Sequence, residues 1–150
     1  MVKVQISSRF TIAIHIFACI DTFRDEHKLT SDFLAGSINV NPVIIRKVLQ
    51  QLKKADLVSV KRGSGGVDVA RPFSEITLLD IFRAVDSIEE NQLFHFHDNP
   101  NTACPVGRNI HKALDDKLES IQQAMERQMR SITVEDVIRD TQSCIQKKNA

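Results

Sequence analysis

The sequence contains no tryptophan and no tyrosine, so phenylalanine is the only large aromatic residue available for stacking. Proteins that hold single-stranded nucleic acid or RNA usually stack the bases on aromatic side chains, and this lack disfavours that function. No stretch approaches the roughly 20 apolar residues that a membrane-spanning helix needs. The first ten residues, MVKVQISSRF, lack the charged, apolar and small-residue order of a secretory signal. We therefore expect neither membrane insertion nor secretion.

Cysteine and glycine are also scarce. The three cysteines, Cys19, Cys104 and Cys144, are an odd number at wide spacings, which does not make a disulfide framework and suits a reducing cytoplasm. Three of the five glycines fall in the segment KRGSGG at residues 61–66. This segment matches neither the GxxxxGK[ST] phosphate loop nor the dinucleotide fingerprint, so neither nucleotide-binding motif is present there.

Charge is nearly balanced overall but unevenly distributed. The formal net charge is +1, yet residues 1–73 carry 11 Lys and Arg against 6 Asp and Glu, while residues 74–150 carry 9 against 13. A basic half joined to an acidic half is the asymmetry expected when one end of a protein faces phosphate.

The basic half contains a pattern typical of a helix-turn-helix, between Thr30 and Pro72. Two short helical segments are separated by a turn, and the second begins with Asn41 as N-cap and Pro42 at the first helical position. Its apolar residues recur at helical spacing and predict one buried stripe: Ile44, Ile45, Val48, Leu49 and Leu52. The residues outside the stripe are Arg46, Lys47, Gln50 and Gln51. A short helix with a basic, amide-rich front suits the major groove of DNA.

A two-stranded hairpin is predicted directly after this helix. Residues 57–60 and 67–70 alternate as short strands do, and the glycines between them suit a tight tip. Lys61 and Arg62 place two cations at that tip, where they can contact phosphate or enter a narrow minor groove. Together the two motifs predict a winged helix-turn-helix.

The remaining helices are predicted from caps and periodicity. We expect helices over residues 8–23, capped by Ser7 or Ser8, and over residues 76–85, with Thr77 as cap. A last short helix over residues 135–142 follows Thr133, and the tail after it is expected to fray. Cys19 and His15 in the first helix are expected to be core or boundary residues.

Residues 105–131 predict one long amphipathic helix. Apolar residues step by three or four along it, and the stripe contains Val106, Ile110, Leu114, Leu118, Ile121, Met125, Met129 and Ile132. At 1.5 Å per residue this helix is about 40 Å long. So long a stripe is hard to cover within a small domain, so two copies are expected to pair through it as a two-fold dimer. An intramolecular contact with the first helix is the alternative.

The fold expected from these elements is mainly α with a small β-hairpin wing: a winged helix-turn-helix with a long C-terminal dimerisation helix. We divide the chain into a DNA-binding domain over residues 1–74, a linking helix and sensor-like loop over residues 75–104, and the dimerisation helix with its tail over residues 105–150.

Four segments resemble the Rrf-two family of bacterial transcription regulators. They are SRFTIAIHIFACI, NPVIIRKVLQQLKKADLVSVKRGSGG, ARPFSEITLLDIFRAVD and NPNTACPVGRNI, which leads into the long helix. The resemblance covers nearly the whole chain, and the second and third segments together are specific. It implies a dimer that binds palindromic operators in double-stranded DNA, with the long helix as the dimer interface. We expect the regulator to repress transcription.

Several members of that family hold an iron–sulfur cluster through three cysteines in the loop before the long helix. Here only Cys104 lies between Glu89 and Pro105, whereas a cluster needs about three or four ligands. Cys104 with His95 and His97, and Asp98 as a further candidate, leaves a metal- or cluster-responsive regulator as an alternative. We expect the chain to resemble the branch without a cluster and to need no cofactor.

Cys104 also suggests a thiol sensor. It directly precedes Pro105, the expected first residue of the long helix, and the free N–H groups at a helix start favour thiolate. Its oxidation beside the dimer helix can move the DNA-binding parts. An inert cysteine at the helix start is the alternative.

Two further function classes remain open from the residues alone. An enzyme could use Cys104 as nucleophile with His95 or His97 as base, but no residue is placed by sequence to orient the histidine or to hold an oxyanion. A protein-interaction module without DNA affinity is disfavoured by the basic helix and wing. We therefore expect a regulator rather than an enzyme.

The expected DNA-contacting residues follow from these positions. Base edges are reached from the start of the second helix, by Asn39, Asn41, Val43, Arg46 and Lys47. Arg46 is the best candidate for a bidentate contact with guanine. Lys61 and Arg62 are expected on phosphate or in the minor groove, and Ser8 and Arg9 on a phosphate at the first helix start. Lys53 and Lys54 are expected on a solvated face.

Overall fold

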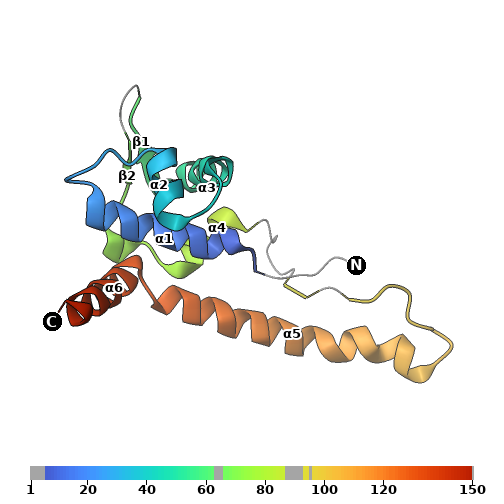
Figure 1. Cartoon of the computed structure of the whole chain (residues 1–150). Helices are drawn as coiled ribbons and strands as arrows, with labels where there is room; N and C mark the ends of the chain where they lie inside the picture. The colour runs from blue at the N-terminus through green and yellow to red at the C-terminus, as the bar shows by residue number, and fades with distance from the viewer. Residues whose placement is uncertain (1–5, 63–65, 87–92, 95, 150) are drawn as a thin grey trace. The chain divides into compact units, whose positions relative to one another are not determined.

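The computed structural model describes residues 6–62, 66–86, 93–94 and 96–149. The described residues belong to two compact units, the larger within residues 6–87 and 129–150 and the smaller within residues 88–128. The elements follow one another along the chain as α1(Ser8–Phe23), α2(Ser31–Ile38), α3(Pro42–Lys54), β1(Val58–Val60), β2(Val67–Val69), η1(Phe73–Glu75), α4(Leu78–Val85), α5(Pro105–Ser131) and α6(Val134–Lys148) (Figure 1). The expected fold class, mainly helical with one hairpin, is confirmed.

Helices α2 and α3 form the helix-turn-helix because the local sequence specifies both ends of the turn. Thr30 caps α2, and its side-chain oxygen accepts a hydrogen bond from the Phe33 N–H at 3.1 Å. Asn39 ends the helix in the left-handed conformation, with φ of 61°, a region that asparagine tolerates better than most residues. Asn41 and Pro42 then start α3 as expected.

The core of the larger unit lies where α1, α3 and α4 meet. Side chains with no solvent exposure come from each of these helices and from the segments between them: Ile16, Phe17, Ile20, Leu34, Ile45, Val48, Leu52, Ile76 and Ile81. Phe10 of α1 meets Phe82 of α4 edge to face, with ring centroids 5.9 Å apart. This shared core fixes α3 relative to α1 and α4.

The hairpin is antiparallel, with Val58 opposite Val69 and Val60 opposite Val67. Each strand is one residue shorter than expected at the end away from the tip, and residues 63–65 of the tip lie outside the described residues. The Val67 N–H donates to the Leu29 carbonyl at 3.0 Å, so the connection between α1 and α2 is tied to the wing.

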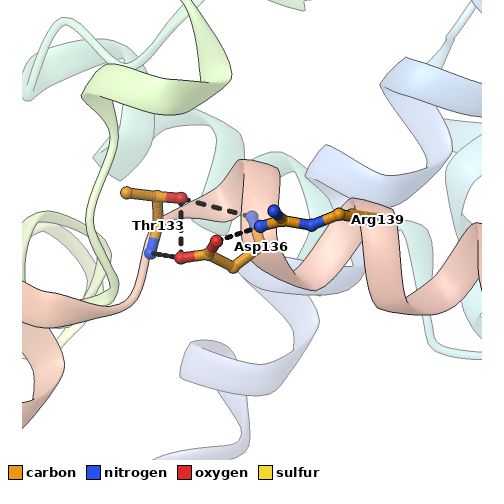
Figure 2. A network of polar contacts seen from close by, with 3 residues as sticks. All are labelled: Thr133, Asp136 and Arg139. Atoms are coloured by element: carbon orange, nitrogen blue, oxygen red, sulfur yellow. Dashed lines mark hydrogen bonds and ion pairs between the residues drawn. The ribbon is translucent and has the colours of Figure 1, made fainter.

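Helices α4 and α6 start side by side through matching caps. Thr77 with Asp80, and Thr133 with Asp136, each form a capping box in which side chain and backbone bond reciprocally. Figure 2 shows the second box together with Arg139, which also bonds Asp136. Backbone bonds from Leu78 to Ile132 and from Val134 to Ile76, at 2.9 and 2.8 Å, join the two starts.

Most of the long helix α5 belongs to the smaller unit, and its bounds are those that the sequence predicts. A preceding loop lies against one side of it. The Phe96 ring stacks on His111 with centroids 4.3 Å apart, and the Leu93 N–H donates to Oε1 of the buried Gln122 at 3.3 Å. That side is separate from the one that carries Val106 and Ile121, which are 68% and 53% exposed.

Several expectations about single residues are wrong. Ile44 is 39% exposed because it lies at the edge of the α3 stripe, beyond the reach of the core. His15 is exposed rather than a core or boundary residue, while Cys19 is buried as expected and burial raises the pKa of its thiol. The tail does not fray at residue 142, since α6 continues to Lys148. Gln51, expected on the open face, is half-buried and donates to the Val85 carbonyl.

The short helix η1 was not expected, and it follows Pro72 after the wing. None of the described helices combines the length and the apolar character required to cross a membrane.

Candidate nucleic-acid interface

The start of α3 presents an exposed surface with both polar and apolar groups. Asn41 accepts a hydrogen bond from the Val43 N–H at 2.8 Å through its side-chain oxygen. This bond holds the Asn41 side chain at the helix start. Val43 is 50% exposed and stands beside the exposed Ile44. Apolar side chains in such a position suit the methyl group of thymine in the major groove.

Arg46 is exposed but not unpaired, because its guanidinium lies 3.8 Å from the carboxylate of Asp32 in the first turn of α2. Lys47 is exposed on the next position of α3. Arg46 also lines a surface hollow of about 260 Å³ between α2, α3 and β1, together with Ser31, Leu49, Gln50, Lys53 and Val60. One side of α3 therefore faces the wing and combines cationic, amide and apolar groups.

Asn39 is exposed, and its left-handed backbone is what ends α2. Its structural role is thus established, whereas its contact with a base stays a prediction. Lys61 and Arg62 are both exposed at the outer end of β1, and the Lys61 N–H donates to the Gly66 carbonyl at 3.2 Å. This backbone bond joins the two sides of the hairpin next to residues 63–65, which lie outside the described residues.

The first helix starts in a different environment from the one expected for a simple phosphate site. Ser7 is the N-cap, and its side chain accepts from the Arg9 N–H at 3.1 Å. The Ser7 N–H donates to Asp86 Oδ1 at 3.3 Å. Asp86 is only 9% exposed. Burial raises the pKa of this carboxyl, although the Ser7 bond and the nearby Arg9 charge act in the opposite direction. A carboxylate therefore already occupies the neighbourhood of Ser8 and Arg9.

Cys104 lies at the start of α5, where Asn101 shapes the loop before it. The Cys104 N–H donates to the Asn101 carbonyl at 3.2 Å, and the Ala103 N–H donates to the side-chain oxygen of Asn101 at 3.0 Å. Gly107 is required here, because a Cβ at that position would meet the Asn101 carbonyl oxygen at 2.3 Å. The Cys104 thiol is exposed, and backbone hydrogen bonds from Gly107 and then Val106 lower its pKa.

The candidate metal ligands do not form a ligand set where the structure describes them. His97 meets His111 edge to face with centroids 5.7 Å apart, and the buried Nε2 of His111 has no hydrogen-bond partner among the described residues. His95 lies outside the described residues. Within the described residues, no group of three or more His, Cys, Asp or Glu side chains could hold a metal ion. This donor set does not fit an iron–sulfur cluster, which needs about three or four ligands.

Of the residues that bear on α3, sequence reasoning missed Asp32 and placed Gln51 in the wrong environment. Asp32 pairs with Arg46, and Gln51 bonds the end of α4 at 3.3 Å. The acidic residue in the first turn of α2 was a visible helix-start signal. Its partner on another helix is a tertiary contact that no local pattern indicates.

The comparisons with known proteins agree with this geometry. The model of the Rrf2 family, the Rrf-two family named above, is described as "Iron-dependent Transcriptional regulator" and matches residues 6–140. A Bacillus subtilis (strain 168) protein named "Putative HTH-type transcriptional regulator YwnA" is 41% identical over 134 residues, which cover 89% of this chain and 97% of that protein.

Two solved structures share the fold. A crystal structure described as that of "a putative DNA binding protein" is 38% identical, with a TM-score of 0.70, and covers 87% of this chain and 99% of its own. A structure described as that of "a putative transcriptional regulator" from Lactobacillus plantarum has a TM-score of 0.73 over 95% of this chain and 97% of its own. Its sequence is 23% identical, so this second likeness concerns the fold alone.

Proposed function

Because this chain belongs to the Rrf2 family of DNA-binding transcription regulators, we propose that two copies of it bind a palindromic operator and repress transcription in the cytoplasm. Regulation of transcription, and not catalysis, is the function of the family. The observation that carries the proposal is the exposed start of α3, where Arg46, Lys47 and Val43 stand clear of the core beside a cationic wing.

In this proposal α3 lies in the major groove. Asn39, Asn41, Val43, Arg46 and Lys47 are the residues that approach base edges. A bidentate contact between Arg46 and guanine contributes about 1–3 kcal/mol of discrimination. Arg46 must first leave Asp32, but an exposed ion pair is worth only about 0–1 kcal/mol, so the exchange favours the base contact.

The wing and the first helix position the protein without selecting a sequence. Lys61 and Arg62 reach phosphates or the minor groove from the outer end of β1. Ser8 and Arg9 approach a phosphate at the start of α1, and Arg9 supplies the positive charge there. The buried carboxyl of Asp86 opposes an anion at this point, so we expect the contribution of Ser8 and Arg9 to be smaller than that of the wing.

We place the dimer interface on α5. Val106 and Ile121 of its apolar stripe are among the most exposed apolar side chains described, and the other stripe residues are half-buried. The loop that contains Phe96 stacks on His111 at the flank of the stripe, and of the stripe residues Leu118 lines the hollow beside Phe96. An accessible stripe of helical period along about 40 Å of helix is a surface that a second copy with the same stripe can cover.

The dimer is tested by disrupting this stripe. Leu114→Asp combined with Ile121→Asp should halve the solution mass and abolish tight operator binding, measured by sedimentation and by gel shift. Gln123→Asp, which lies on the opposite side of α5, is the matched control. A wild-type protein that is a single subunit at micromolar concentration and does not bind duplex DNA at low salt would refute the proposal.

The operator and the direction of control are tested with the same protein. Capture of genomic fragments by the purified wild type should enrich sites with two inverted half-sites, one helical turn or a multiple apart. Transcription from promoters that contain these sites should rise when the protein is absent. Enrichment of unpaired half-sites, or a fall in transcription, would contradict the palindrome or the repression respectively.

We also propose that oxidation of Cys104 regulates DNA binding. The lowered pKa of its exposed thiol favours the thiolate, which is the nucleophilic form. The thiolate sulfur attacks one oxygen of a hydroperoxide, the O–O bond breaks, and the other oxygen leaves and takes up a proton. The sulfur is oxidised by two electrons to sulfenic acid, and the hydroperoxide is reduced. The new polar group at the start of α5 then alters the packing of the dimer helix, and this change moves the DNA-binding parts.

The metal-responsive alternative, with His95, His97 and Cys104, is not favoured by the donor set of the described residues. Absorption spectra of protein purified without oxygen provide the test, since a cluster absorbs in the visible range. A visible band that is lost on substitution of His97 would restore this alternative.

A further inference from the structure

Cationic side chains gather in a hollow beside the wing, separate from the exposed start of α3. The hollow measures about 210 Å³ and is lined by the turn after α1 and by the ends of the two strands nearer the tip of the hairpin: Arg24, His27, Lys28, Leu29, Lys61, Gly66, Val67 and Asp68. Only Lys61 of these was singled out as a DNA contact. We propose that this hollow binds a phosphate of the DNA backbone, beyond the groove that α3 occupies, and this inference rests on the proposed function.

Backbone geometry brings the two segments together. The Val67 N–H bonds the Leu29 carbonyl at 3.0 Å, and a Cβ on Gly66 would meet the Leu29 nitrogen at 2.5 Å. Only glycine permits this approach, so the turn after α1 is pressed against the start of β2. Lys28 and Lys61 therefore line one hollow although they are far apart in the sequence.

Two of the lining side chains are held in place by aromatic rings. The His27 ring stacks on Phe33 with centroids 5.0 Å apart and an interplanar angle of 26°. The Arg24 guanidinium lies over the Phe73 ring, 5.6 Å from its centroid, and 3.5 Å from Asp68. Groups already ordered before binding lose less conformational freedom when an anion arrives.

The charge balance of the lining favours an anion. Asp68 is its one carboxylate and is shared with Arg24. Lys28 and Lys61 remain without an ion pair at the distances that define the described salt bridges. Asp25 and Glu26 are exposed in the same turn but do not line the hollow. The hollow has room for about seven water volumes, enough for a phosphate group with some of its hydration.

The source of the phosphate follows from the position of the hollow. Lys61 lines the hollow, and Arg62, the other cation of the wing, follows it directly in the chain. An anion in the hollow therefore lies next to the part of the wing that we propose contacts DNA. A backbone phosphate beside the wing contact is therefore the ligand, and free phosphate is the competing source of the same chemistry.

The test compares salt dependence of duplex binding. Each phosphate that the protein neutralises contributes about −0.9 to the slope of log K against log salt. On a duplex that contains the operator, Lys28→Gln should reduce the magnitude of the slope by about 0.9 for each subunit, while Lys28→Arg keeps it. Lys147→Gln is the matched control, because Lys147 lies on α6, on the other side of the larger unit from the hairpin (Figure 1). Thermal unfolding of each variant establishes that it is folded.

Each result decides the inference. A reduced salt slope in Lys28→Gln, with no change in the Lys147→Gln control, supports the inference. The double variant Lys28→Gln with Lys61→Gln should lose less affinity than the two single variants lose in sum, because both lysines contact one phosphate. An unchanged slope overturns it. An unchanged slope with inorganic phosphate stabilising the wild type but not Lys28→Gln assigns the hollow to free phosphate and also overturns it. Failure of the wild type to bind any duplex refutes the proposed function itself. This outcome differs from failure of the inference alone, in which the wild type still binds duplex DNA.

Discussion

The guanidinium of Arg46 on α3 lies 3.8 Å from the carboxylate of Asp32 on α2. Both side chains are mainly exposed, so the attraction is screened by water and salt. The pair nevertheless places a negative charge next to the residue that we expect to contact guanine. Free protein therefore holds Arg46 in an arrangement that binding must exchange for a base.

Replacement of Asp32 should strengthen DNA binding. Asp32→Asn removes the competing carboxylate and its repulsion from phosphate, and we expect the affinity to rise about two- to fivefold at low salt, as the size of an exposed ion pair implies. Gel-shift titration measures this. Asp56→Asn, an exposed site after α3 whose left-handed backbone asparagine tolerates, is the control. A lower affinity in Asp32→Asn would show that Asp32 orients Arg46 for the base instead.

Arg46 and Arg62 should respond differently to substitution. Arg46→Ala should reduce discrimination at one operator position by about 1–3 kcal/mol, whereas Arg62→Ala should weaken all sequences alike and reduce the salt slope by about 0.9. Binding to an operator and to each of its single-base variants measures both effects. Equal losses across all sequences for both variants would contradict the division into base-contacting and positioning residues.

Cys104 should be the thiol through which oxidants act. Peroxide, hypochlorite or a disulfide stressor should lower the operator affinity of the wild type and leave Cys104→Ser unaffected. Because hydrogen bonds from Gly107 and Val106 lower the pKa of this thiol, its alkylation should reach half its maximal rate at a lower pH in folded than in unfolded protein. A Cys144→Ser background isolates it, as Cys19 is buried. Equal DNA binding by oxidised and reduced wild type would exclude the sensor.

Asp86 should weaken the fold at neutral pH. Burial raises the pKa of its carboxyl, so the folded state keeps the proton to higher pH than the unfolded state does. Stability then falls as pH rises from the ordinary carboxyl range through the raised pKa. Asp86→Asn keeps an acceptor for the Ser7 N–H without the charge and should stabilise by about 1 kcal/mol at neutral pH. Denaturation at about pH 4 and pH 7 should show the gain shrinking in acid.

The exposed Asp140→Asn provides the comparison for Asp86→Asn. It removes one carboxylate from the same unit without altering the buried group. If Asp86→Asn were less stable than the wild type at neutral pH, the ionised carboxylate would have to be a favourable part of the fold.

Asp136 should have the opposite pH dependence. The hydrogen bond from the Thr133 N–H lowers the pKa of this carboxyl, with further contributions from the Thr133 side chain and Arg139 (Figure 2). Its contribution to stability is present above the ordinary carboxyl pKa and is lost as pH falls through the lowered one. Asp136→Asn should therefore lower the unfolding midpoint at neutral pH and match the wild type in strong acid. A constant difference at every pH would assign the effect to packing.

Long and strongly capped elements were predictable from sequence. The bounds of α5, and the caps Asn41, Thr77 and Thr133, agree with the expectations, because helical period and capping depend on residues within one or two turns. The end of α6 was not predictable from a charged tail alone. Gln142, the last residue of the expected helix, bonds Asp21 of α1 at 2.7 Å, and α6 continues beyond it through exposed residues to Lys148.

In the candidate site too, some features were predictable from the local sequence and others depended on tertiary contacts. The exposed residues of α3 could be named in advance from their position relative to the apolar stripe, although Ile44 and Gln51 were assigned to the wrong environment. Residues at the edge of a stripe are decided by how far the opposing core reaches, which the sequence of one helix does not contain.

The amino-acid order alone specified the caps, the helical periods, the hairpin and the resemblance to a regulator family, since each of these depends on residues close together along the chain. Folding decided which distant charges come near one another: Asp32 pairs with Arg46, and Lys28 and Lys61 line one hollow beside the contact between Leu29 and Gly66. Such arrangements form through the packing of separate segments, and the interaction of charges at a few ångströms, attractive or repulsive, depends on that packing rather than on spacing in the chain.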